Sequence, residues 1–112
     1  MQPKKPPVVR SLTALQVQRR IQRGERIRII DVRDPNEYTA GHIPGAELIP
    51  MDHIPTAIYQ LKVDEDVLFV CRSGSRSLRV CEYLSAKGFT RVINLKGGMM
   101  QWSGRVERDA AQ

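Results

Sequence analysis

The seven residues from Cys71 to Ser77, CRSGSRS, place a thiol beside small, polar and cationic residues. They directly follow the apolar run VLFV and precede a helical pattern. In open parallel sheets, ligands bind beyond the carboxyl ends of the strands. Where a helix begins, its first backbone N–H groups lack helical partners and can hold an anion. We therefore predict that Cys71 is a reactive thiolate at the end of a strand.

The residues that follow Cys71 are suited to surround a sulfur anion. The loop amides, with Arg72 and Arg76 nearby, should lower the pKa of the thiol below its ordinary value of about 8.5. Gly74 allows a tight turn. Small hydroxyl groups add donors without filling the pocket, and the loop has three of them, Ser73, Ser75 and Ser77. The alternative is that Cys71 is an ordinary core cysteine. That alternative does not account for Arg72 and Arg76 close by, because arginines are rarely buried unless they are paired.

The second cysteine, Cys81, has a different predicted role. It lies on the apolar face of the next helical segment, roughly 15 Å of helical rise from Cys71. We expect it to pack in the core, with a resolving thiol as the alternative. Two cysteines are too few for a disulfide framework, and no cysteine or histidine cluster has zinc-ligand spacing. We therefore expect no metal and no other cofactor.

Strand-like and helix-like segments alternate along the chain and must position this loop. The predicted strands are 8–10, 26–32, 47–49, 63–71 and 91–95, and the predicted helices are 14–23, 55–61, 76–87 and 97–104. Residues 34–37, DPNE, are predicted to form a turn. This order predicts an α/β fold, with an open, mostly parallel sheet of about five strands and helices on both faces.

Two of these helices carry specific expectations. Thr13 should cap the first helix, because Gln16 follows three residues later. The buried face of that helix should comprise Ala14, Val17 and Ile21. In the helix after the loop, Leu78, Cys81 and Leu84 recur at three-residue steps and should form the buried face. Val80 and Tyr83 should widen this face.

The length and charge of the chain limit its organisation and its partners. A chain of 112 residues is enough for one domain, and we predict a flexible, basic, proline-rich arm at 1–7, a domain at 8–106 and a C-terminal tail at 107–112. The net charge of +6 favours anionic ligands, but few aromatic residues accompany the basic ones, which disfavours nucleic acid as a partner. No apolar run approaches the ~20 residues that cross a bilayer, and the first residues do not resemble a secretory signal. We expect a cytoplasmic protein without membrane contact, as a monomer or weak dimer.

Four segments of the chain, in order, resemble the single-domain rhodanese family, the sulfurtransferases that carry sulfur on a cysteine persulfide. They are IIDVRDPNEYTAGHIPGA, VLFVCRSGSRS, AKGF and VINLKGGMMQW, and the likeness runs from Val8 to Trp102. The resemblance implies an active-site loop from Cys71 to Arg76, in which Cys71 attacks a donor and holds one sulfur as a persulfide. It also implies a small anionic sulfur donor, such as thiosulfate or another persulfide, and an acceptor such as cyanide, a thiol or a protein.

The same resemblance implies roles for residues around the loop. Asp31 and Arg33, with Glu37, resemble a family segment that braces the sheet end beside the active-site entrance. Two-domain relatives that use thiosulfate often have a basic residue in place of Glu37, which argues against efficient use of thiosulfate here. His42 resembles a hydrogen-bonded turn histidine. The closing motif of the family is matched by Gly97, Gly98 and Trp102, and it would bring Met99 and Met100 to the rim of the pocket.

Two other functions share this architecture. Cysteine-dependent phosphatases and arsenate reductases have one more residue between cysteine and arginine than the four that separate Cys71 from Arg76. The shorter loop favours sulfur over phosphate. The remaining alternative is a docking or regulatory module without turnover. Alkylation distinguishes it, because an enzyme loses all transfer activity when Cys71 is blocked, whereas a dormant module should have an unreactive Cys71.

Overall fold

The computed structural model describes residues 9–109, so the predicted arm at 1–7, Val8 and the last three residues lie outside the described residues. The elements follow one another as strands, α-helices and short 3-10 helices (η). In chain order they are β1 (Arg10–Thr13), α1 (Ala14–Gln22), β2 (Arg28–Asp31), α2 (Pro35–Ala40), β3 (Glu47–Leu48), η1 (Met51–His53), α3 (Ile54–Ala57), η2 (Ile58–Gln60), β4 (Val67–Val70), α4 (Ser75–Ala86), β5 (Val92–Lys96) and η3 (Gly98–Gln101).

The described strands form one sheet in the order β1-β5-β4-β2-β3, and each pairing between them is parallel. This confirms the predicted α/β fold with a five-stranded parallel sheet. β4 lies in the middle of the sheet, and all four of its residues are buried, as expected for a strand that is covered on both faces. Cys71 follows its carboxyl end directly.

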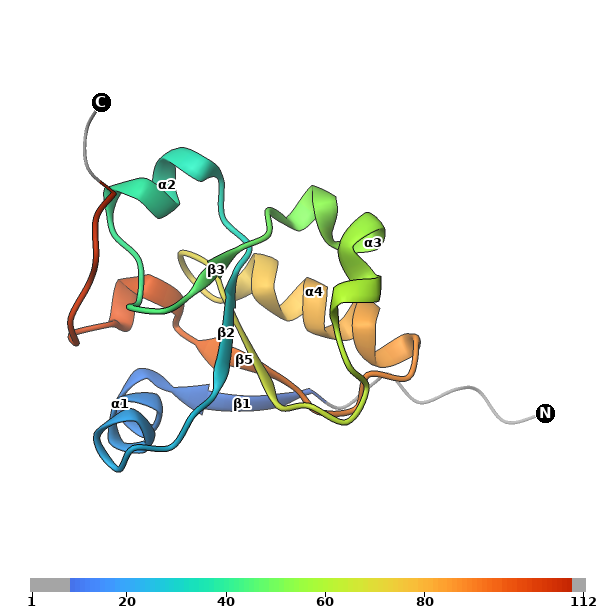
Figure 1. Ribbon diagram of the computed structural model, residues 1–112, viewed down its shortest axis with the longest axis horizontal. Coiled ribbons are helices and arrows are strands. Elements are labelled where there is room, and N and C mark those ends of the chain that lie inside the picture. Colours follow the sequence, from blue (N-terminus) through green and yellow to red (C-terminus); the bar gives the residue numbers. More distant parts are fainter. Residues whose placement is uncertain (1–8, 110–112) are drawn as a thin grey trace.

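Helices cover both faces of the sheet, as predicted (Figure 1). α3 and α4 pack on one face, where Phe69 of β4 and Leu84 of α4 belong to one apolar cluster. α1 packs on the other face, where Leu68 and Val17 belong to a second cluster. Successive strand residues point to opposite faces, so adjacent residues of β4 serve different cores. None of the helices in the described part of the chain is long and apolar enough to cross a membrane.

The first helix begins as predicted, but its last turn does not pack as predicted. Gln16 N–H donates to Thr13 Oγ1 at 3.2 Å and Thr13 N–H donates to Gln16 Oε1 at 2.8 Å, which completes the capping box. Val17 is buried, whereas Ile21 is 42% exposed. The prediction for Ile21 is wrong because this side chain, in the last turn of α1, lines a surface hollow with Trp102.

The turn predicted at 34–37 is instead the beginning of helix α2. Asp34 is the N-cap, Pro35 is in the first turn, and Asp34 N–H donates to Glu37 Oε1 at 3.2 Å. Proline at the first position and an acidic residue three positions after the cap both favour helix initiation. The residue types that favour a turn are therefore the same ones that begin this helix.

α4 buries Val80, Cys81 and Leu84 as predicted, but Ser77 is buried in place of Leu78 and Tyr83. Its buried residues are Ser77, Val80, Cys81 and Leu84, which have the i, i+3, i+4, i+7 spacing of a helix face. Leu78 and Tyr83 are each 37% exposed, so their predicted burial is wrong. Steps of three residues drift away from the helical period of 3.6. The observed stripe turns Ser77 toward the sheet, beneath the loop.

Candidate active site

The loop from Cys71 to Ser77 leads directly from β4 into α4. Gly74, at the N-cap of α4, has a φ of +98°, a left-handed conformation that glycine adopts without steric penalty. A Cβ at this position would also lie 3.2 Å from both Leu95 O and Gly97 N. The tight turn that the sequence indicated at Gly74 therefore requires glycine for two reasons, its conformation and its close neighbours.

Two hydrogen-bond donors from the loop reach the Cys71 sulfur. Gly74 N–H donates to Sγ at 3.1 Å, and the Ser77 hydroxyl, whose one hydrogen can turn to either Sγ or Asn94 Oδ1, lies 3.3 Å from Sγ. Burial acts to raise the pKa of the Cys71 thiol, but the Ser77 hydroxyl and the amides of Ser77, Gly74 and Ser73 outweigh it, so the pKa is lowered from its ordinary value. The direction agrees with the prediction, and backbone amides with one hydroxyl are its main source.

Arg76 is held in an ion pair with Glu37 of α2. Its Nη1 and Nη2 donate to the two carboxylate oxygens at 2.9 and 3.0 Å, and both side chains are 30% exposed. The bond to Glu37 is the main reason that the pKa of Arg76 is raised, and the charge of Cys71 raises it further. The same bond lowers the pKa of Glu37. An anion that approaches the loop therefore meets a charge pair, not a free guanidinium.

The other polar side chains of the loop lie at its surface. Arg72, Ser73 and Ser75 are exposed, and the hydroxyls of Ser73 and Ser75 lie 3.1 Å from each other. Of the three predicted hydroxyl donors, Ser77 is the one that the structure places on the sulfur, while Ser73 acts on the thiol through its backbone amide. The loop therefore has a buried side, where Gly74 and Ser77 contact the sulfur, and an exposed side, which carries the side chains of Arg72, Ser73 and Ser75.

The segment after β5 holds the loop from another side. Met99 N–H donates to Cys71 O and Met100 N–H donates to Arg72 O, each at 2.9 Å. This approach requires Gly98, because a Cβ there would lie 2.6 Å from Cys71 O. The closing motif therefore brings both methionines against the loop, with Met100 exposed and Met99 partly buried.

Asn94 is the residue of this region that the sequence analysis missed. It lies on β5 and is only 5% exposed. Its Oδ1 accepts a hydrogen bond from Ser77 Oγ at 2.5 Å, and its Nδ2 donates to Gly74 O at 3.3 Å. A signal was present in the sequence, because Asn94 interrupts the apolar run of Val92, Ile93 and Leu95, and a buried amide needs hydrogen-bond partners.

Asp31 and Arg33 form a buried brace at the end of β2. Arg33 Nε and Nη2 donate to the Asp31 carboxylate at 2.7–3.1 Å. Glu37 binds Arg76 of the loop and also lies within reach of the charge of Arg33. His42 is buried, its Nδ1 lies 2.8 Å from Tyr38 O, and its ring stacks on that of Tyr38, so it has the hydrogen-bonded position expected of a turn histidine.

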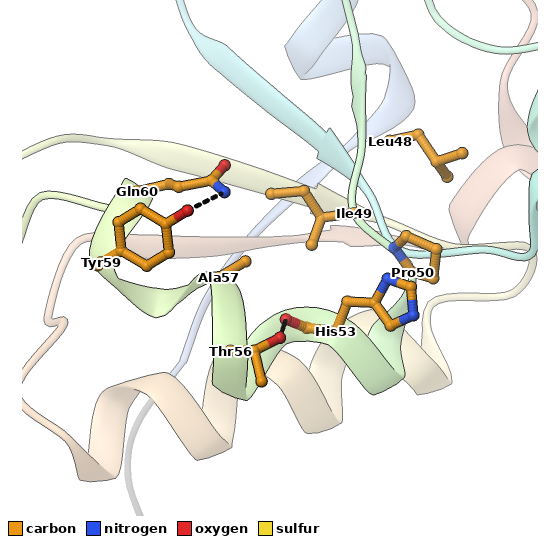
Figure 2. Close-up of a pocket in the computed structure, with 8 residues that line it drawn as sticks. All are labelled: Leu48, Ile49, Pro50, His53, Thr56, Ala57, Tyr59 and Gln60. Atoms are coloured by element: carbon orange, nitrogen blue, oxygen red, sulfur yellow. Dashed lines mark hydrogen bonds between the residues drawn. The ribbon is translucent and has the colours of Figure 1, made fainter.

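A separate hollow of about 430 Å³ lies beside the edge strand β3 (Figure 2). His53, Tyr59 and Gln60 are among its lining residues, and none of the loop residues 71–77 is. Its lining has neither cysteine nor carboxylate, so the nucleophile is not in this hollow. Across residues 9–109, no three His, Cys, Asp or Glu side chains are grouped so as to hold a metal ion.

Known proteins share this sequence pattern and this fold. The family model of the rhodanese-like domain matches residues 13–105. The chain is 36% identical over 96 residues to a sulfurtransferase of Allochromatium vinosum, covering 86% of this chain and 90% of that one. It is 38% identical over 88 residues to thiosulfate sulfurtransferase GlpE of Pseudoalteromonas translucida, covering 75% of this chain and 84% of that one. A crystal structure of a rhodanese-like domain protein from Staphylococcus aureus, 35% identical, superposes with a TM-score of 0.84 over 91% of this chain and 100% of that one. By sequence and by fold, then, the chain belongs to the rhodanese-like domain family.

Proposed function

We propose that the protein is a sulfurtransferase that carries sulfane sulfur as a persulfide on Cys71. The observation that carries this proposal is the pair of donors on the Cys71 sulfur, from Gly74 at 3.1 Å and Ser77 at 3.3 Å. Hydrogen bonds to a charged group favour its charged form. A thiolate and a persulfide are both anions, so the same donors suit both states of the reaction cycle.

The proposed cycle has two displacement steps on sulfur. In the first, the Cys71 thiolate attacks the outer sulfur of a donor such as thiosulfate. A new sulfur–sulfur bond forms, the sulfur–sulfur bond of the donor breaks, and sulfite leaves with the electron pair. In the second, cyanide, a thiol or a protein nucleophile attacks the outer sulfur of the persulfide and releases the Cys71 thiolate. No general base is required, because the surroundings of the cysteine favour its ionised form.

The burial of Cys71 bears on which molecules can react with it. The residue is fully buried, so the donor must present a sulfur atom at the end of a narrow or extended group. The outer sulfur of a persulfide lies about 2 Å beyond Sγ, one sulfur–sulfur bond length. The acceptor therefore reacts with an atom that lies farther out along the side chain than the thiolate itself.

The charges at the loop bear on the choice of donor. GlpE is named a thiosulfate sulfurtransferase, which makes thiosulfate the first donor to test. Glu37 offsets the charge of Arg76 beside the loop, so we expect a dianion such as thiosulfate to be used less efficiently than a donor of lower charge. Both cysteines are free thiols, which suits the reducing cytoplasm as the place of action.

The test is thiocyanate formation from thiosulfate and cyanide by the purified chain. We expect turnover by the unmutated protein, none by Cys71→Ser, and most of the rate in Cys81→Ser. Cys81→Ser is a matched control because it makes the same exchange of sulfur for oxygen within the same apolar cluster. Turnover by Cys71→Ser would sink the proposal. So would an unmutated protein that is inactive with both thiosulfate and mercaptopyruvate, and the docking module would then be the better explanation.

A further inference from the structure

We propose that Asn94 is a positioning residue that holds both donors of the Cys71 sulfur in place. Its side chain lies on the α4 side of β5, because Ile93 and Leu95 on either side of it belong to the opposite core. An amide in this buried position costs free energy unless its oxygen and nitrogen both find partners. Both do, and both partners belong to the loop and the first turn of α4.

Each hydrogen bond of Asn94 ends on a residue that also donates to the sulfur. Oδ1 accepts from Ser77 Oγ at 2.5 Å, and the same hydroxyl lies 3.3 Å from Cys71 Sγ. Nδ2 donates to Gly74 O at 3.3 Å, and the N–H of the same residue donates to Sγ at 3.1 Å. One side chain therefore supports both donors from behind. If the only role of Asn94 were to satisfy its own polar atoms, any buried donor and acceptor would serve. Its partners are instead the two residues that contact the sulfur, Ser77 and Gly74.

The Ser77 hydroxyl shows why this support matters. A serine in a helix can donate to the carbonyl three or four residues earlier, which here means Gly74 or Ser73. Such a bond would take its hydrogen away from the sulfur. The contact with Asn94 instead keeps Oγ between Oδ1 and Sγ. Because a thiolate or persulfide is a much stronger acceptor than a thiol, the hydrogen can turn to the sulfur when the anion forms.

The Ser77 hydroxyl has one hydrogen, and both Asn94 Oδ1 and Cys71 Sγ can accept it. Asn94 could therefore compete with the sulfur for this hydrogen instead of supporting the donor. If competition outweighed positioning, removal of Asn94 would release the hydrogen to the sulfur and lower the pKa of Cys71. We expect positioning to dominate, because Asn94 also holds Gly74, whose amide donor has no share in that competition. The two possibilities therefore differ in the sign of a measurable shift.

The test is the pKa of Cys71, measured from the pH dependence of its alkylation rate by mass spectrometry. Asn94→Leu has similar volume and removes both bonds, and we expect it to raise the pKa by about one unit. Asn94→Ala carries the same expectation if the leucine variant does not fold. Ile93→Ala, on the opposite face of the same strand, should lower stability and leave this pKa unchanged. The charged and titratable groups near the loop stay the same in all of these variants, namely Arg72, Arg76, Glu37, Asp34, Asp31, Arg33 and the neutral thiol of Cys81.

A double-mutant cycle with Ser77→Ala tests whether Asn94 acts through the donors. We expect the shift caused by Asn94→Leu to shrink by at least twofold in the Ser77→Ala background, because only the Gly74 donor then remains to be displaced. An unchanged pKa, a lowered pKa, or an equal shift in both backgrounds would overturn the proposal. The effect on turnover rests on the proposed function, but the pKa does not. If the chain transferred no sulfur at all, the pKa measurement would still decide the role of Asn94.

Discussion

Cys71 and Cys81 are two buried free thiols in the same apolar cluster, yet their surroundings act on them in opposite directions. For Cys71, burial raises the pKa, but the hydrogen bonds of Ser77 and of the loop amides outweigh it and lower the pKa. For Cys81, burial is the main cause and raises the pKa to about 12, with small additions from Glu82 and Cys71. Burial alone therefore does not decide how a thiol of this protein reacts.

The difference follows from where each cysteine lies relative to α4. Cys71 precedes the first turn, where backbone N–H groups have no helical partner and are free to donate to a ligand or a sulfur. Cys81 lies within the helix, where the amides bond to carbonyls one turn earlier. Only nine residues thus separate a sulfur that is surrounded by donors from one that is surrounded by apolar side chains.

The largest expected effect is in the alkylation rates of the two thiols. The pKa of Cys71 lies below the ordinary value of a thiol, about 8.5, and that of Cys81 is raised to about 12. The thiolate fractions near neutral pH should therefore differ at least about a thousandfold. With iodoacetamide followed by peptide mapping, we expect modification of Cys71 alone, at a rate that rises with pH and levels off once the lowered pKa of Cys71 is passed. Comparable modification of Cys81 in the folded protein would remove the contrast.

The next largest effect is expected from Gly98→Ala, which should push the segment after β5 away from the loop. Gly98→Ala combines a positive φ of +59° with a Cβ that would lie 2.6 Å from Cys71 O, so we expect a loss of about 3 kcal/mol in urea unfolding and slower alkylation of Cys71. Gly88→Ala is the matched control, because its φ is also positive but nothing lies near its Cβ. It should cost about 1 kcal/mol and leave Cys71 unchanged. Equal losses in the two variants would show that the loop does not depend on this close approach.

Ser77→Ala should make the surroundings of Cys71 more like those of Cys81. It removes one donor from the sulfur and leaves Asn94 Oδ1 without its partner. A hydrogen bond to a charged group contributes about 1.5–3 kcal/mol, so we expect the pKa of Cys71 to rise by about one to two units. The pH profile of alkylation measures this shift. A pKa that does not move would mean that the backbone amides account for the ionisation on their own.

The smallest expected effect concerns the charge pair at the loop. The pKa of Glu37 is lowered from 4.5, chiefly by Arg76, so the pair stays charged at neutral pH and a variant is needed to break it. Glu37→Gln frees Arg76 from its charged partner and should lower the KM for thiosulfate a few-fold at low ionic strength. The gain should fade as salt increases, because both side chains are partly exposed. A higher KM in this variant would indicate that Glu37 organises the loop instead of offsetting its charge.

The sequence predicted the position of the loop and the class of fold well, because both depend on local signals. An apolar run that ends in CRSGSRS marks a strand end, a turn and a helix start within a few residues. The alternation of strands and helices leaves few arrangements other than a parallel sheet. The capping box at Thr13 is another local signal, and the structure contains it.

Three features were not predicted, and each has a different cause. Ser77 and Leu78 are adjacent, and a rotation of one residue decides which of them faces the sheet. The residues at 34–37 favour a turn and a helix start about equally. Asn94 lies 17 and 20 residues from its partners Ser77 and Gly74, so only the pairing of β5 beside β4 brings them together.

Whether Cys71 carries the transferred sulfur can be decided from the intact mass of the reduced protein after incubation with thiosulfate and removal of the excess. We expect a gain of one sulfur atom, about 32 Da, that maps to Cys71 and is discharged by cyanide. Cys81→Ala should show the same gain, and Cys71→Ala should show none. A gain that maps to Cys81, or no gain with either thiosulfate or mercaptopyruvate, would show that Cys71 is not the sulfur carrier.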